Sequence, residues 1–216
     1  MENLLQYIND GGPPIMWTLV VLFVFGLAIT FWRLVVIVLA MMSTRSLYIR
    51  VLEALREPDG GLEKASEICK KTPGPVATIV HAGLSRVTMG VDLVERAIEN
   101  AGAIEMAFLE NGLAWLATIA TVSPMIGFFG TVAGMIKAFR DIAAMGDVQP
   151  SVVAGGISIA LITTAGGLLV AIPIQMAYNL CVYLIDRIGV SMEENASQLI
   201  DTLIEMDYIK TSHGDS

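Results

Sequence analysis

The longest uncharged stretch of this chain, residues 152–185, constrains its fold more than any other feature. It contains 34 residues without a single Asp, Glu, His, Lys or Arg. As a helix it would measure about 50 Å at ~1.5 Å per residue, whereas the hydrocarbon core of a bilayer is about 30 Å thick. We therefore expect a membrane-crossing helix that continues well past one face of the bilayer and is covered there by other protein.

Two further apolar runs predict two more crossings. Residues 15–32 are uncharged, and after Arg33, expected near the headgroups, the apolar sequence resumes as far as residue 42. Residues 113–136 form another uncharged run of 24 residues, which is long enough to cross a bilayer. Only 16% of the chain is charged, against about a quarter in a typical soluble domain. The chain is therefore predicted to be an all-α membrane protein with three spans.

The distribution of Lys and Arg predicts the orientation of these spans. Residues 41–112 hold eight of the 13 basic residues and residues 1–14 hold none. Basic loops stay in the cytosol, so residues 41–112 are expected there and the N-terminus outside. A cleavable signal peptide begins with basic residues, so this N-terminus is expected to be retained. The expected segments are an outer N-terminal segment (1–14), a first span with its extension (15–42), a cytosolic helical region (43–112), a second span (113–140), an outer loop (141–151), a third span (152–186) and a cytosolic C-terminal helix and tail (187–216).

The region between the first two spans is predicted to be helical. The turn clusters EPDGG (57–61) and KTPGP (71–75) divide it into short helices. In residues 91–112, apolar side chains recur at helical spacing and predict one apolar face, with the neighbouring charges in solvent. That face comprises Leu93, Ala97, Ile98, Ala101, Ile104 and Phe108, and the charges off it are Glu95, Arg96, Glu99 and Glu105.

Several classes of function are disfavoured by the residues present. A formal net charge of −8 argues against nucleic-acid binding. The spacing of Cys69 and Cys181 fits neither a metal site nor a disulfide framework, so both are interpreted as free thiols, and no metal or cofactor is expected. His81 and His213 lie outside the apolar runs and are interpreted as surface or structural residues. Because no histidine lies in a span to act as a base for a serine nucleophile, an intramembrane hydrolase is disfavoured and the chain is not expected to be an enzyme.

Small residues form a stripe on each of the last two spans. In the second span the stripe comprises Ser123, Gly127, Thr131 and Gly134, with Gly130 beside it, and in the third span it comprises Gly156, Ala160, Thr164 or Thr163, Gly167 and Ala171. Such stripes let membrane helices pack closely, so the two spans are expected to form an antiparallel hairpin. Pro124 and Pro173 would each bend a helix and free a backbone carbonyl. Packing alone is one sufficient explanation of the stripes, since Ser and Thr in helices often bond back to their own backbone.

The last two apolar runs also lack any titratable side chain of the kind that relays protons. Residues 113–136 and 152–185 contain no Asp, Glu, His, Lys or Arg, and a threonine hydroxyl cannot exchange a proton near neutral pH. This chain alone is therefore not a proton relay. Two alternatives remain open from composition: the chain is half of a pathway whose acid comes from another polypeptide, or it is no pathway at all.

Three motifs resemble the spans of one known family. LAWLATIATVSPMIGFFGTVAGMIKAF (113–139) is similar to the second span of the ExbB/TolQ/MotA family, and GGISIALITTAGGLLVAIPIQMAYN (155–179) is similar to its third span. GGPPIMWTLVVLF (11–23) looks like its first span. Because the chain has three predicted spans rather than four, it resembles the ExbB/TolQ branch of this family.

The resemblance implies a function. Members are motor subunits of the bacterial inner membrane that form a pentameric ring around a dimer of a single-span ExbD/TolR-type partner. That partner supplies an intramembrane aspartate, and ion flow driven by the proton-motive force produces work for the cell envelope. The implied ion pathway comprises Thr131, Thr164, Thr163 and Ser158, and the implied pore wall and packing residues are Ser123, Pro124, Gly127, Gly130, Gly134, Gly156, Gly167 and Pro173.

One residue departs from the family pattern. Ile159 stands where the family usually has a glutamate in its third span. This replacement removes a candidate ion-binding group. It favours the alternative hypothesis of a membrane scaffold of the same fold that conducts no ions.

Overall fold

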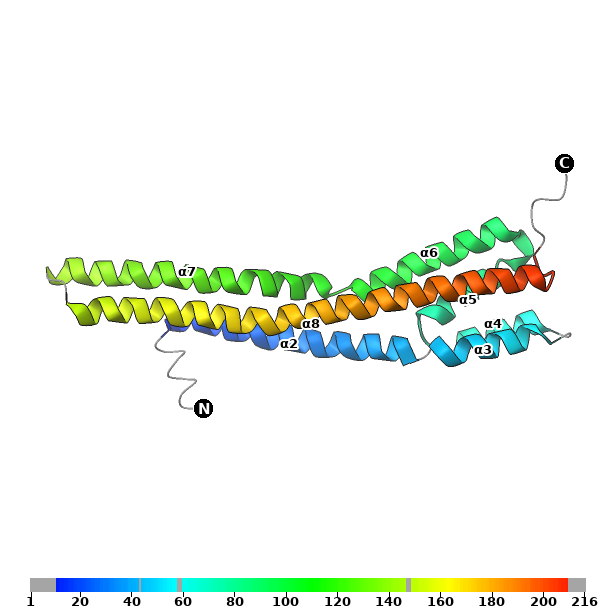
Figure 1. Ribbon diagram of the computed structural model, residues 1–216, viewed down its shortest axis with the longest axis horizontal. Coiled ribbons are helices and arrows are strands. Elements are labelled where there is room, and N and C mark those ends of the chain that lie inside the picture. The colour runs from blue at the N-terminus through cyan, green and yellow to red at the C-terminus, as the bar shows by residue number, and fades with distance from the viewer. Residues whose placement is uncertain (1–10, 43, 58–59, 147–148, 210–216) are drawn as a thin grey trace. The chain divides into compact units, whose positions relative to one another are not determined.

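The chain is helical in every region that the structure describes. The computed structural model describes residues 11–42, 44–57, 60–146 and 149–209, and no strand occurs among them (Figure 1). The predicted all-α fold is confirmed. These residues belong to two compact units, one formed by residues up to 33 and 112–180, the other by residues 34–111 and those from 181 onward. Most of the expected N-terminal segment, and the end of the tail with His213, lie outside the described residues.

Three helices carry the apolar runs. They are α2 (Pro13–Met42), α7 (Leu113–Met145) and α8 (Pro150–Glu205), and each is long and apolar enough to cross a membrane. α8 has 56 residues, about 84 Å at ~1.5 Å per residue. No helix boundary occurs at residue 186, where the third span was expected to end. The apolar sequence stops there, but Asp186 and Arg187 are compatible with a helix, so the backbone continues unchanged.

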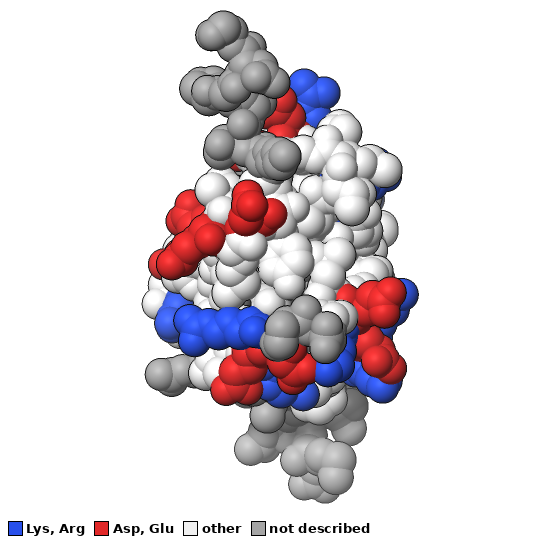
Figure 2. Space-filling view, turned by 90° about the vertical axis from the view of Figure 1, so that its right-hand side faces the viewer, with Lys and Arg blue, Asp and Glu red and all other residues white. Residues whose placement is uncertain are grey.

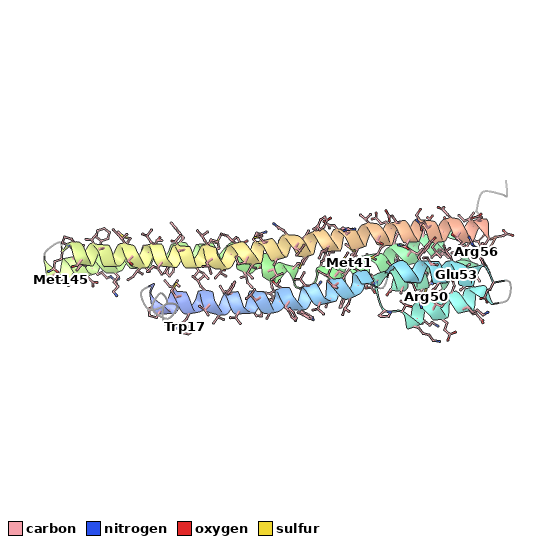
Figure 3. All side chains as sticks on the ribbon, turned by 60° about the horizontal axis from the view of Figure 1, so that its bottom comes forward. Trp17, Met41, Arg50, Glu53, Arg56 and Met145 are labelled. Carbon is pink, nitrogen blue, oxygen red and sulfur yellow. The ribbon has the colours of Figure 1, made fainter. Side chains whose placement is uncertain are left out.

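These three helices expose a large number of apolar side chains on their surface. In the most apolar window of α2 only 17% of residues are buried within the protein. Trp17, Val21 and Phe31 are 50%, 63% and 73% exposed, and Figure 3 shows Trp17 near the start of α2. Soluble monomers rarely expose such continuous apolar surface. α2, α7 and α8 are therefore membrane helices.

The connection between α7 and α8 is shorter than the predicted loop. The expected loop was 141–151, but α7 continues to Met145 and α8 begins at Pro150. α7 ends where Gly146 takes a left-handed backbone conformation with φ of +68°, and the N–H of Gly146 donates to the carbonyl of Ile142. Glycine is favoured at such a terminus and proline at a helix start.

The second unit contains the short helices predicted between the first two spans. They are α3 (Thr44–Leu55), α4 (Gly61–Lys71), α5 (Pro75–Leu84), the 3-10 helix η1 (Val87–Met89) and α6 (Val91–Glu110). The breaks after α3 and α4 fall at the two predicted turn clusters. Figure 3 shows Arg50 and Glu53 on α3, followed by Arg56 directly after its end. The core of this unit is apolar and includes Val51, Ala65, Ile79, Leu199 and Leu203.

The predicted apolar face of α6 is only partly buried. Val94, Ile98 and Leu109 are buried, whereas Ile104 and Phe108 are 70% and 59% exposed. Leu93 is also exposed. Of the six residues predicted to form one apolar face, only Ile98 is buried, because the apolar side chains of α6 cover a wide arc. The α5 and α8 side chains inside the unit meet only one edge of that arc, where Ile98 lies against Gly83 and near Leu199.

His81 and Cys69 in this unit have the surroundings expected of a structural histidine and of a free thiol. His81 is half-buried, and its Nδ1 lies 3.2 Å from the Ser66 hydroxyl, as suits a structural histidine. Cys69 is a free thiol that is only 3% exposed, and burial raises its pKa from 9.0 to about 11.

We predict that Cys69 resists thiol reagents in the folded protein. The thiolate is the reactive form, and a pKa raised by two units leaves about 100-fold less thiolate at any pH below 9. Maleimide labelling at pH 7.5, quantified on the Cys69 peptide by mass spectrometry, should be at least about 100-fold slower than in denatured protein. Equal rates in native and denatured protein would show that Cys69 is accessible and its pKa normal.

Candidate functional site

The centre of the first unit is a close seam between α7 and α8. A methyl group added at Gly167 would lie 2.6 Å from the carbonyl oxygen of Ser123 and 3.1 Å from the Cα of Gly127. Added at Gly134, it would lie 3.0 Å from the carbonyl oxygen of Gly156. The two backbones therefore touch, and only hydrogen atoms fit at these glycines. Such contact is how small residues hold membrane helices together.

The residues in contact across the seam differ from the predicted small-residue stripes at one position on each helix. On α7 the seam contains Gly130, and Thr131 lies beside it, because a methyl group on Gly130 would overlap the Thr163 side chain. On α8 the seam contains Thr163, which is fully buried, whereas Thr164 is only half-buried. This resolves the open choice between Thr163 and Thr164 in the stripe. Ser123 is fully buried in the same seam and donates to the carbonyl of Ile119 over 2.6 Å.

Thr131 and Thr164 share a local geometry. Thr131 Oγ1 donates to the carbonyl of Phe128 over 2.6 Å, and Thr164 Oγ1 donates to the carbonyl of Ala160 over 3.1 Å. Both side chains are half-buried rather than enclosed. A hydroxyl that donates its proton in this way keeps oxygen lone pairs that can accept another hydrogen bond or contact a cation.

Helical geometry places these two threonines on the same flank of the seam. Thr131 directly follows Gly130 and Thr164 directly follows Thr163, so each is turned by ~100° in the same sense from a seam residue. Because α7 and α8 are antiparallel, equal turns of this kind point to the same side. Their levels are also close, since the Cα of Thr164 packs on Gly127, and Thr131 is one turn, about 6 Å, further along α7. We call this side the threonine flank.

The threonine flank is open, whereas on the opposite flank α2 packs against α8. Gly166, which precedes the seam residue Gly167, faces Met16 and Leu19 of α2. On the threonine flank, three of the residues that directly follow seam glycines are exposed, and Thr131 and Met135 are half-buried. The exposed residues are Phe128, Ile157 and Leu168, with exposed fractions of 67%, 44% and 46%.

The remaining predicted residues are not gathered beside the threonines. Ser158 is exposed and lines a groove at the loop end of α7 and α8 together with Lys137 and Asp141. Ile159 packs against Gly134 and Gly12, and because it precedes the seam residue Ala160 it lies on the α2 side. A carboxylate at residue 159 would therefore not share the threonine flank. Pro124 is half-buried and Pro173 exposed, and neither interrupts its helix.

Sequence reasoning missed the environment of Arg33. Its side chain, expected near the headgroups, is only 1% exposed. Its Cδ lies 3.5 Å from where a methyl group on Gly112 would be, and its guanidinium lies 6.0 Å from the centre of the Trp32 ring. Gly112 itself is explained by its left-handed backbone, with φ of +87° at the start of α7, and no local sequence signal indicated that Arg33 would be buried beside it.

The site offers hydroxyl chemistry and close packing. Across the described residues, no three His, Cys, Asp or Glu side chains are grouped so that they could hold a metal ion. The uncharged runs in α7 and α8 contain no Asp, Glu, His, Lys or Arg. The threonine flank can accept hydrogen bonds from an acid or hydrate an ion, but any proton exchanged there must be carried by another group.

Comparisons with known proteins agree with this picture. The profile of the MotA/TolQ/ExbB proton channel family matches residues 71–194. The chain is 49% identical over 84 residues to the Tol-Pal system protein TolQ of Haemophilus influenzae, covering 39% of this chain and 37% of that protein. It is 37% identical over 130 residues to TolQ of Pseudomonas aeruginosa, covering 57% and 52%. It is 34% identical over 127 residues to the biopolymer transport protein ExbB of Pseudomonas putida, covering 55% and 39%.

These alignments span about half, or less, of the length of the relatives. The family profile, by contrast, covers more than half of this chain. It includes the whole of α5, α6 and α7, and α8 as far as residue 194. The chain belongs to the MotA/TolQ/ExbB proton channel family.

Proposed function

We propose that this chain is an ion-driven motor subunit of the bacterial inner membrane. In this proposal a single-span partner of the ExbD/TolR type packs against the threonine flank and supplies an intramembrane aspartate. The observation that carries the proposal is the open flank itself. Thr131 and Thr164 present oxygen lone pairs there, in spans that contain no acid of their own.

The hydroxyls suit both protonation states of such an aspartate. When the carboxyl group is protonated, it can donate to a threonine oxygen whose own proton is bound to its helix. When the carboxylate is ionised, the hydroxyl can rotate and donate to it instead, because a threonine hydroxyl is both donor and acceptor. Proton binding and release would thus reverse one hydrogen bond, and the partner span would move relative to the flank.

The seam gives this site a rigid wall. Because the α7 and α8 backbones touch at Gly127, Gly134 and Gly167, the two threonines keep a fixed separation while a partner moves past them. α2 supports the opposite flank. We place the threonine flank toward the interior of a pentameric ring around a partner dimer, with the N-terminus outside and residues 43–112 in the cytosol. The printed names of the relatives, Tol-Pal system and biopolymer transport, suggest that the work is passed to the cell envelope.

Ion flux in proteoliposomes tests this proposal. The chain would be reconstituted alone, with the Asp-bearing partner, and with a partner whose aspartate is changed to Asn. We expect proton flux only for the chain with the intact partner. Two results would contradict the proposal. One is flux from the chain alone, and the other is a stable complex that conducts no protons at any applied gradient.

A second candidate function is a non-conducting scaffold, and Ile159 favours it. Its side chain fills space against Gly134 and Gly12, as a packing residue does. If a carboxylate at this place were required, Ile159→Glu should create flux in a complex that otherwise has none. Flux through the unchanged chain with its partner would exclude the scaffold.

A further inference from the structure

A groove between α6 and the second half of α8 lies entirely within the second unit. Ile79, Ile98 and Met192 form its buried base, and Met106 contributes to its wall. It follows α6 from Glu95 to Met106, which is about 16 Å or three helical turns. A groove of this length fits a helical segment of roughly the same number of turns.

Small residues keep the groove open. Gly102 of α6 and Gly189 of α8 line it, and a methyl group at Gly102 would have no neighbour closer than 3.8 Å. Their missing side chains leave space that the sulfur-containing side chains of Met106 and Met192 border. Methionine is flexible and polarizable, and it is common on surfaces that accept apolar side chains of varied shape.

The rim of the groove is acidic. Glu95 and Glu99 of α6 lie on one side and Glu193 of α8 on the other, and the lining includes no Lys, Arg or His. All three carboxylates are exposed. Figure 2 shows that acidic side chains on this end of the protein gather in a cluster on otherwise uncharged surface, above a band where basic and acidic side chains mix.

We propose that this groove binds an amphipathic helix of another protein, with an apolar face flanked by Lys and Arg side chains. The apolar face would enter between the methionines, at the i, i+3, i+4 and i+7 spacing of helix-in-groove recognition. The basic side chains would meet Glu95 and Glu99 on one side and Glu193 on the other. This docking site is separate from the threonine flank, and the inference does not depend on ion flow.

The charges argue against the other occupants. Anionic lipid headgroups and nucleic acids would be repelled by the three carboxylates. Two of the three lysines of α4 already pair locally, which leaves them less able to meet the acidic rim of a second copy. Lys64 pairs with Glu57, and Lys71 lies 2.7 Å from Glu67.

Peptide binding to the full chain tests the inference. The protein would be placed in nanodiscs of zwitterionic lipid, with empty nanodiscs as the background. The probe is a fluorescent 14-residue peptide of Leu and Lys with leucines at helical spacing, and its controls are a scrambled peptide of the same composition and one with Glu in place of Lys. We expect saturable binding of the first peptide only, which weakens as salt is raised because exposed charges are screened.

A matched pair of variants locates the site. Glu95→Gln, Glu99→Gln and Glu193→Gln combined should raise the peptide Kd roughly 10-fold. The control is Glu110→Gln, Asp201→Asn and Glu205→Gln combined, which removes the same charge from exposed positions of α6 and α8 that do not line the groove. Its Kd should be unchanged. Gly102→Leu, which fills the groove, should abolish binding.

Three results would overturn the inference. They are equal binding by the two triple variants, equal binding of the scrambled peptide, and a groove variant that changes self-association instead of peptide binding. The last result would identify a second copy as the occupant. Proteoliposome flux of the same variants is measured separately, so failure here is distinguishable from failure of the proposed motor function.

Discussion

Thr164→Val should strongly reduce partner-dependent ion flux while leaving the helical fold and the complex intact. Valine has nearly the shape of threonine, so packing of α8 changes little, but the oxygen that faces the open flank is lost. A carboxyl group placed against the valine would then lack a hydrogen-bond partner, and leaving such a group unsatisfied costs about 1–3 kcal/mol. We expect flux to fall at least about 10-fold, measured in proteoliposomes with the complex quantified by co-purification.

The neighbouring Thr163→Val is the matched control. Thr163 is fully buried in the seam, and its hydroxyl lies within hydrogen-bond distance of two carbonyls of its own helix, those of Ile159 and Ala160. Its loss should change the free energy of unfolding by about 1 kcal/mol and leave flux unchanged. If Thr163→Val stops flux as completely as Thr164→Val, the open flank is not what distinguishes the two threonines.

This pair also shows how far sequence reasoning reaches. The uncharged runs predicted α2, α7 and α8, and the small-residue stripes predicted that α7 and α8 pack on each other. The stripes could not decide which residue of an adjacent pair lies in the seam. Small residues cover a wide arc of each helix, and Gly130 and Thr131 are both compatible with it. Contacts across the seam, such as that between Gly130 and Thr163, fix the rotation of the two helices.

The sequence also could not predict contacts between segments that are far apart in the chain. The sequence predicts that residues 91–110 form a helix with an apolar side, and α6 is that helix. Which edge is buried depends on α5 and on the second half of α8, and no local pattern encodes their positions. The groove lined by Gly102 and Gly189 arises in the same way, since these residues are 87 positions apart. Arg33 is likewise buried beside Gly112, which precedes α7 and is 79 positions away.

Gly167→Ala should destabilise the protein strongly for so small a change. The added methyl group would lie 2.6 Å from the carbonyl oxygen of Ser123 and 3.1 Å from the Cα of Gly127. Both are backbone atoms, so no side chain can turn aside, and α7 and α8 must move apart along the seam. Overpacking of this kind costs about 1–3 kcal/mol, and we expect the upper end of that range because the obstacle is backbone. Unfolding in mixed micelles, followed by circular dichroism, measures the change.

Gly155→Ala is the control that separates crowding from helix propensity. Gly155 lies on the same helix, and a methyl group there would meet nothing within 4 Å. Replacing glycine by alanine in an unobstructed helix stabilises it by up to about 1 kcal/mol. The two substitutions should therefore act in opposite directions although they add the same atoms. If Gly167→Ala were as stable as Gly155→Ala, the α7 and α8 backbones would not be in contact, and the seam would not hold Thr131 and Thr164 at a fixed separation.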